Sequence, residues 1–204
     1  MILQSFKNDE RGVSMVEFGI LALPLSIIMM GGLELGYQSY VRSHLQGSLS
    51  DIARLASVED PQFQANGDTL EERILNTLEE RMEPLANNSE LDLEISNYTD
   101  FSGVGKPEKL VRDVMGNGTY DEADGDCFED LNENDTFDLD TGRDGLGGSN
   151  DVVVYEVALV QPRLFPVPTS VGFSEDLVVN ATIAIRRQPY GAQATPPIIC
   201  GTAS

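Results

Sequence analysis

The hydrophobic pattern of the chain is dominated by an uncharged run near the amino terminus. Residues 18–33 contain no Asp, Glu, Lys or Arg, and the weakly polar stretch from Val13 to Leu35 has 23 residues. A helix of that length rises about 35 Å at 1.5 Å per residue, which is sufficient to cross a bilayer with some tilt. The pattern therefore predicts a transmembrane helix over residues 13–35.

A cleaved secretory signal peptide is the usual alternative for such a run. That alternative requires a small-residue cleavage site after the apolar segment. Here the run continues into Gly31-Gly32-Leu33-Glu34-Leu35-Gly36, with no A-x-A pattern. We therefore expect the apolar helix to remain on the mature chain as an anchor.

The rest of the chain has the pattern of a mixed helix and strand domain. Apolar residues recur at helical spacing from Gly36 to about Val58, and again in a second helix that Asp68 could cap and Pro84 would end. Alternating or branched apolar residues indicate strands at residues 91–95, 152–159 and 177–185. The sequence predicts an α+β, pilin-like fold, in which a long transmembrane and then amphipathic helix packs on a small antiparallel sheet. No internal repeat is evident.

The charge of the chain limits its partners. The 204 residues carry a formal net charge of -21, with a sequence pI near 4.1. A surface of this kind repels phosphate backbones, so no nucleic-acid binding is expected. Two cysteines are present, Cys127 and Cys200, and they can form a disulfide if this part of the chain is exported. Two unpaired thiols are the alternative.

Much of the negative charge lies in an acidic loop over residues 121–151. This loop contains twelve carboxylates and one basic residue, Arg143. Such a density of charge belongs either to a solvated loop or to one that is organised around a cation.

Part of the acidic loop resembles the pattern of a calcium-binding loop. Counted from Asp130, oxygen side chains fall at positions one, three, five and nine, where a calcium loop places its ligands. Position six is Asp135 rather than Gly, and position twelve is Thr141 rather than Glu. The pattern predicts Ca²⁺ as a cofactor, and the solvated loop remains the alternative. The expected ligands are Asp130, Asn132, Asn134, Thr136, Asp138 and Asp140.

A single carboxylate, Glu17, interrupts the apolar stretch from Val13 to Leu33. A carboxylate inside a membrane is costly unless it is paired, so Glu17 is a candidate functional residue. The alternative is that its side chain extends to the cytoplasmic headgroups.

The segment Arg11-Gly12-Val13-Ser14-Met15-Val16-Glu17-Phe18 has the pattern of a type IV-like prepilin. Together with Leu23-Pro24-Leu25, Gly32-Leu33-Glu34-Leu35-Gly36 and Ala53-Arg54, it resembles the TadE-like family, the minor pilins or pseudopilins of tight-adherence (Tad) pili. Residues 151–155 and 185–190 also resemble the carboxy-terminal part of these proteins.

The resemblance implies a site of processing and a site of assembly. Prepilin peptidase would cut between Gly12 and Val13, so that residues 1–12 are a leader, residues 13–35 the anchor and residues 36–204 an exported domain. The new α-ammonium of Val13 would lie four residues before Glu17 on the same helix face. Glu17, with the adjacent Phe18, would then act in assembly, because pairing with an ammonium greatly reduces the cost of burying a carboxylate.

The resemblance also implies a structural function. We expect a single-pass protein of the bacterial inner membrane, with its amino terminus in the cytoplasm and its carboxy-terminal domain in the periplasm or pilus. Its partners would be prepilin peptidase, other Tad pilins and pseudopilins, and inner-membrane assembly proteins in a type II secretion-like system that serves adhesion.

Two other functions are weighed against this one. The first is a membrane-anchored, calcium-dependent binding module or adhesin that does not enter a filament. The second is an anchored hydrolase, but the sequence favours no enzyme. The sole histidine, His44, lies on the juxtamembrane helix, and Glu156 on a strand is more typical of a solvent-facing carboxylate.

Overall fold

The computed structural model describes residues 13–86, 88–165 and 174–202, which form an α+β arrangement and confirm the expected fold class. The helices are α2 (Val13–Ala56), α3 (Leu70–Met82) and a short 3-10 helix, η2 (Glu122–Asp124). One antiparallel sheet has the order β4 (Arg143–Asp144), β1 (Glu90–Tyr98), β5 (Val152–Pro162), β6 (Asp176–Arg186). A second sheet has the order β2 (Lys109–Arg112), β3 (Cys127–Glu129), β7 (Ile198–Cys200).

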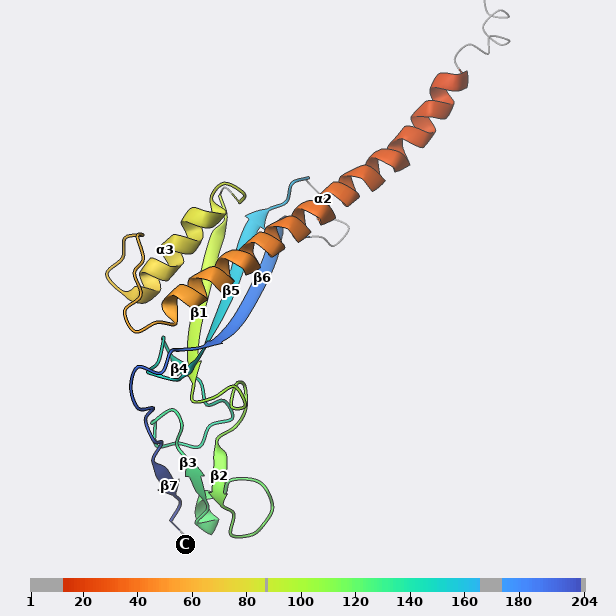
Figure 1. Ribbon diagram of the computed structural model, residues 1–204. Helices are drawn as coiled ribbons and strands as arrows, with labels where there is room; N and C mark the ends of the chain where they lie inside the picture. The colour runs from red at the N-terminus through yellow and green to blue at the C-terminus, as the bar shows by residue number, and fades with distance from the viewer. Residues whose placement is uncertain (1–12, 87, 166–173, 203–204) are drawn as a thin grey trace, which may run out of the picture.

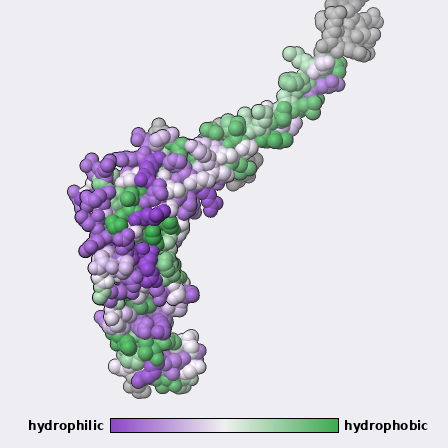
Figure 2. Space-filling model, in the orientation of Figure 1, coloured by the Kyte–Doolittle hydropathy of each residue, from purple (hydrophilic) through white to green (hydrophobic). Residues whose placement is uncertain are grey.

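Helix α2 is continuous over 44 residues but has two different halves. No residue before Glu34 is buried, and that half projects away from the rest of the chain (Figure 1). Figure 2 shows hydrophobic residues along this projecting part and mostly hydrophilic residues on the domain beyond it. The second half has a buried stripe at helical spacing, made of Val41, Leu45, Leu49, Ile52, Ala53 and Ala56. The same helix therefore serves as an uncovered apolar rod and then as a core element.

Helix α3 begins one residue later than the sequence suggested. Its N-cap is Thr69, not Asp68, because the Thr69 hydroxyl accepts the N–H of Glu72 at 3.1 Å. The Glu72 carboxylate in turn accepts the N–H groups of Thr69 and Asp68, at 3.5 and 2.7 Å. This reciprocal capping box satisfies amides at the start of the helix that have no partner within it.

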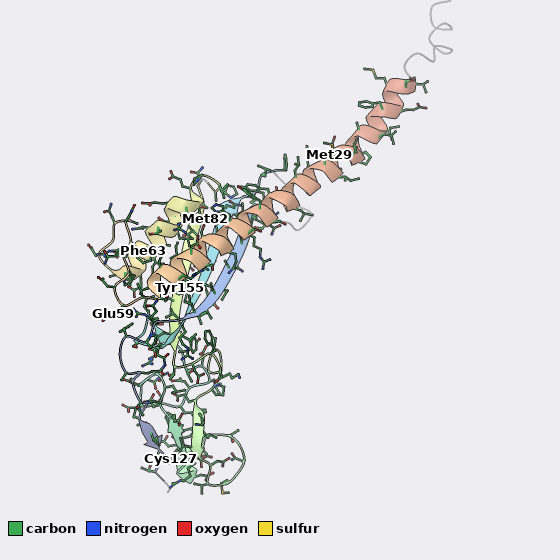
Figure 3. The ribbon with its side chains drawn as sticks, viewed as in Figure 1. Met29, Glu59, Phe63, Met82, Cys127 and Tyr155 are labelled. Atoms are coloured by element: carbon green, nitrogen blue, oxygen red, sulfur yellow. A yellow bond between two sulfur atoms is a disulfide. The ribbon has the colours of Figure 1, made fainter. Side chains whose placement is uncertain are left out.

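The main core lies between the two helices and the sheet of β1, β5 and β6. The buried stripe of α2 and three residues of α3, Ile74, Leu78 and Met82, contact the inward side chains of the strands. Tyr155 of β5 is the largest fully buried side chain, and Figure 3 shows it with Met82 where the helices cover the sheet. The opposite face of the sheet carries polar residues such as Glu94, Glu156 and Thr182.

The three strands expected from alternation are present, and each is longer than expected. Residues 91–95, 152–159 and 177–185 lie in β1, β5 and β6, which pair without a register shift. The short strands β2, β3, β4 and β7 were not predicted. The prolines of residues 162–168 indicate an extended connector, and its residues 166–168 lie outside the described part of the chain.

Strands β2, β3 and β7 lie at the end of the molecule opposite the apolar half of α2 (Figure 1). We call residues 99–142 and 194–202 the distal lobe. Arg187 lies at the junction above it, where its guanidinium donates to the carbonyls of Gly147 at 2.6 Å and Val58 at 3.3 Å. The end of β6 is thereby connected to the segment that follows α2.

The core predicts the stability cost of a truncation in α2. We expect Leu49→Ala to lower the free energy of unfolding by about 2–5 kcal/mol, because Leu49 is fully buried and the surrounding side chains fill a cavity only in part. The control Leu55→Ala, at a position 47% exposed on the same helix, should change it by less than about 0.5 kcal/mol. Denaturant unfolding of the full chain in detergent measures both, and equal costs would contradict this packing.

Candidate functional site

The first candidate site is the uncovered half of α2. This helix is long and apolar enough to cross a membrane, and none of its most apolar window is buried inside the protein. Large side chains such as Met15, Phe18 and Leu21 are 67–81% exposed. In water so much exposed apolar surface would be strongly unfavourable. A bilayer or other apolar helices can cover it.

Glu17 lies on this apolar rod. It is exposed, and it is four residues after Val13 in continuous helix, so both residues share one face. Phe18 follows on the exposed surface, 72% accessible. Within the described part of the chain no cation lies within ion-pair distance of the Glu17 carboxylate. Gly12, the residue expected before the cleavage point, lies outside the described residues.

A second carboxylate of α2, Glu34, has a different environment that the sequence analysis did not identify. It is 8% exposed, and its Oε1 lies 3.5 Å from a guanidinium nitrogen of Arg163. Its Oε2 accepts the N–H of Phe165 at 3.3 Å. Glu34 therefore holds the segment that follows β5 against α2, at the residue where burial along the helix begins. The feature of the sequence that could have identified Glu34 is its position as the carboxylate at the end of the apolar run.

The second candidate site is the distal lobe, which contains a disulfide. Cys127 of β3 and Cys200 of β7 are register partners and are bonded to each other. Figure 3 shows Cys127 at the far end of the molecule from Met29 of α2. This bond joins segments 73 residues apart in sequence, so the carboxy-terminal strand is covalently held in the second sheet.

Four of the expected calcium ligands come together in residues 130–138, which we call loop B. The Asp130 carboxylate is fully buried and accepts the N–H groups of Asn134 and Asp135, at 3.2 and 2.9 Å. The side-chain amides of Asn132 and Asn134 both donate to Asp138. Asn132 Oδ1 is buried and has no hydrogen-bond partner among the described residues.

The other two expected ligands are placed differently. Thr136 donates its hydroxyl to Asn134 Oδ1 at 2.6 Å. The Asp140 carboxylate accepts from the Gly142 N–H at 3.1 Å and from the Tyr98 hydroxyl at 3.5 Å, so it is engaged outside loop B. In the described part of the chain, no group of three or more His, Cys, Asp or Glu residues is arranged to hold a metal ion.

Loop B is instead supported by a carboxylate from outside it. Glu108 is 3% exposed and accepts the N–H groups of Leu131 at 2.8 Å and Asp138 at 3.1 Å. Burial raises the pKa of Glu108, and the nearby charges of Asp130 and Asp138 raise it further. These carboxylates thus concentrate negative charge at loop B, and the sequence analysis did not identify Glu108 because it lies 22 residues before Asp130.

Loop B has a structural counterpart in residues 113–121, which we call loop A. Asp113 accepts the N–H groups of Gly116 and Gly118 at 2.6 and 2.7 Å, much as Asp130 accepts amides of its own loop. Asn117 Oδ1 accepts both the N–H and the hydroxyl of Thr119 at 2.8 Å, as Asn134 does with Thr136.

Glu108, the carboxylate that supports loop B, also has a counterpart at loop A. Asp126, fully buried, accepts the N–H groups of Val114 at 2.7 Å and Asp121 at 3.0 Å. The two N–H groups of loop A that donate to Asp126 each lie 17 residues before the N–H groups of loop B that donate to Glu108. Tyr120 of loop A stacks on Phe137 of loop B with ring centroids 4.9 Å apart.

The expectation that the chain has no internal repeat was therefore wrong for this region. The repeat could have been found as an offset of 17 residues that aligns identical or similar residues. These pairs are Asp113 with Asp130, Asn117 with Asn134, Thr119 with Thr136, Tyr120 with Phe137, and Asp121 with Asp138. Loop A departs from loop B at Met115, which stands where loop B has Asn132, one of the expected oxygen ligands.

The residues considered for catalysis are not assembled into a site. His44 is half-buried on α2 and lies 3.5 Å from the Ser48 hydroxyl. Glu156 is exposed on the polar face of the sheet, directly opposite Glu94. These positions lie on different elements and do not converge.

The uncovered apolar half of α2, continuous with an α+β domain, defines a single-pass membrane-anchored protein. In a comparison with protein families, the model of the TadE-like proteins matches residues 12–54. This match confirms the TadE-like resemblance over the segment from Gly12 through most of α2. The chain matches no curated protein and no solved structure.

The disulfide predicts a local effect of reduction. In the chain-entropy model, closure of a loop with a sequence separation of 73 contributes about 4 kcal/mol. We expect the double variant Cys127→Ser/Cys200→Ser to increase amide hydrogen exchange in β3, in β7 and in loops A and B. Amides in α2, α3, β5 and β6, which have their own core, serve as the internal reference. Uniform destabilisation of both regions would contradict this division.

Proposed function

We propose that this chain is a minor pilin or pseudopilin that is processed by prepilin peptidase and takes part in the assembly of a Tad pilus. The observation that supports this most is the position of Glu17. It is a lone carboxylate on an uncovered apolar helix, one turn after Val13, inside the segment that matches the TadE-like family.

Processing would give Glu17 a partner. Cleavage between Gly12 and Val13 creates an α-ammonium at the start of α2. Residues four apart on a helix are neighbours on its surface, so this ammonium is within reach of Glu17 of the same chain. It is equally within reach of Glu17 of an adjacent subunit whose helix packs alongside.

Pairing between subunits would set their relative height. The exposed apolar side chains of α2 contact one another or lipid with little directional preference, whereas an ion pair in apolar surroundings is favourable only when its two charges meet. Glu17 would thereby select one axial register of the helices, with Phe18 packing beside it. The partners are then other Tad pilins or pseudopilins and inner-membrane assembly proteins. Residues 36–204 would lie on the periplasmic side or on the pilus.

The test is a comparison of Glu17 variants in cells that assemble Tad pili. We expect the wild-type protein to begin at Val13 by peptide mapping. Glu17→Ala and Glu17→Gln should be exported, inserted and cleaved, yet they should fail to join or support pili, because neither side chain can form the ion pair. Ser14→Ala, on the same uncovered segment, is the control and should assemble normally.

Two results would contradict the proposal. An isolated protein that retains its first twelve residues would remove the processing step. Normal pilus assembly by both Glu17 variants would remove the role of the charge.

We propose as a second function that loop B binds Ca²⁺ and that the ion orders the distal lobe for contact or adhesion. This proposal is supported by the buried Asn132 Oδ1 that has no hydrogen-bond partner among the described residues, and by the raised pKa of Glu108. A bound Ca²⁺ would give Asn132 Oδ1 a partner and would stabilise the charged form of Glu108. Ca²⁺ can do so because it binds oxygen atoms of carboxylates, amides and backbone carbonyls. Asp130, Asn132, Asn134 and Asp138 would supply side-chain oxygens.

The remaining ligands follow from the geometry of the loop. Thr136 occupies position seven, which in calcium loops contributes its backbone carbonyl. Glu108, a carboxylate from outside the loop that accepts the N–H groups of Leu131 and Asp138, would replace the glutamate that position twelve lacks. Asp140, which is bonded to Gly142 and Tyr98, would reach the ion only after giving up those contacts.

We expect the full chain to take up calcium in a calorimetric titration and to unfold at a higher temperature in its presence. At a free calcium concentration 100 times the Kd, the stabilisation is about 2.7 kcal/mol. Asp138→Asn should reduce both effects, whereas Asp121→Asn, the equivalent change in loop A, should leave them largely intact. Acidification should weaken binding at a higher pH than for an ordinary glutamate, since burial raises the pKa of Glu108. The absence of both a heat of binding and a thermal shift at millimolar calcium would contradict the proposal.

A further inference from the structure

The segment that connects β5 to β6 meets α2 at the end of its apolar half. Its described root consists of residues 163–165 and 174–175, where the Arg163 N–H donates to the Glu175 carbonyl at 3.3 Å and the Arg163 Nε donates to the Ser174 carbonyl at 2.8 Å. We call these residues the hairpin root. Figure 1 shows the end of β5 and the start of β6 beside α2, on the side from which the apolar half of the helix projects.

The level of the hairpin root along α2 is set by Glu34. This carboxylate contacts the Arg163 guanidinium at 3.5 Å and the Phe165 N–H at 3.3 Å. The side chains of Glu34 and Arg163 are only 11% and 19% exposed, so the pair presents little charge to its surroundings. The Glu34–Arg163 pair, which we call the clasp, is therefore a contact without net charge between α2 and the hairpin root.

The same level corresponds to the edge of a bilayer. Glu34 is 21 residues after Val13, which is about 32 Å along a helix, and the hydrocarbon core of a bilayer is about 30 Å thick. Leu33 and Leu35 flank Glu34 and are 58% and 66% exposed. Leu164, between the two hairpin residues that contact Glu34, is 50% exposed. Apolar side chains from two separate elements thus continue the surface of the span at this height.

We propose that the hairpin root rests on the phospholipid bilayer at the point where α2 leaves it, with Leu164 at the boundary of the acyl chains. The occupant of this surface is lipid because the surface is continuous with the apolar half of α2, and because the opposite charges of Glu34 and Arg163 neutralise each other where the hairpin root contacts the helix. The Glu34–Arg163 pair sets the height of the exported domain above the membrane. This inference rests on α2 crossing the membrane and does not depend on pilus assembly.

The test places a fluorophore at Leu164 of the full chain in phosphatidylcholine nanodiscs. Both native cysteines are in the disulfide, so Leu164→Cys can be labelled selectively with an environment-sensitive dye. We expect quenching by lipids that carry a nitroxide near the headgroup, and protection from iodide in solution. A label at Leu21 should be quenched by a deep nitroxide, and one at Leu139, which is 78% exposed in the distal lobe, should respond to iodide alone.

The clasp is tested by the same label in Glu34→Gln and Arg163→Gln. We expect lipid quenching at position 164 to fall in both variants while quenching at position 21 is unchanged. Lys109→Gln removes a different ion pair, formed with Glu129 at 3.3 Å, and is the matched control that should change neither signal. Unchanged quenching at position 164 in both clasp variants would overturn the role of the pair.

The remaining outcomes distinguish contact of the hairpin root with the membrane from the membrane span of α2. Quenching at position 21 with free access of iodide to position 164 would overturn the membrane contact of the hairpin root. Protection of position 164 from both quenchers would also overturn it, since a protein surface would then cover Leu164. Loss of lipid quenching at position 21 would remove the membrane span on which the inference rests.

Discussion

The structure depends on one helix that changes its surroundings without a break. Before Glu34, α2 is apolar on all sides, so it has no preferred face to bury and remains uncovered by the rest of the chain. After Glu34, its apolar residues are restricted to one stripe, and that stripe builds the core with α3 and the sheet. Pro24 removes one backbone hydrogen bond within the apolar half, but α2 continues as one helix through Glu34, so the direction in which the helix leaves the apolar half determines the direction of the domain. The position of every other element relative to a membrane follows from that continuity.

The distal lobe is held together by different forces. It has few buried aliphatic residues, and its centre is the ring cluster of Tyr120, Phe128 and Phe137. Buried carboxylates, Asp126, Asp130 and Glu108, take the place of a larger core by accepting backbone N–H groups of loops that have little regular structure. Such bonds are strong because the acceptor is charged, but they concentrate like charges at short range. The disulfide offsets this repulsion by limiting how far the unfolded chain can open.

The sequence predicted the elements that have a strong and repeated pattern. The long helix, the second helix and the strands β1, β5 and β6 could be predicted because each buries a periodic apolar face. Strands of two or three residues have no measurable period, and β3 and β7 form through contacts between residues 73 positions apart. At the candidate sites, Glu17 was recognisable from its apolar neighbours alone. Glu34 was not, because its environment depends on Arg163, which is 129 residues away. The repeat of the acidic loops was missed because it rests on scattered residues rather than on a continuous motif.

Two carboxylates of α2, Glu17 and Glu34, differ in the partners that are available to them. Both interrupt an apolar surface, and each is costly there without a positive partner. Glu34 obtains its partner from Arg163 of the same chain, so the energy of that contact can only fix the internal geometry of one subunit. For Glu17 the described part of the chain supplies no cation within ion-pair distance. A charge that is satisfied internally cannot also select a neighbour, whereas one left unsatisfied can. The difference in burial between these two positions therefore separates a residue that fixes the geometry of its own chain from one that, in the proposed function, joins subunits.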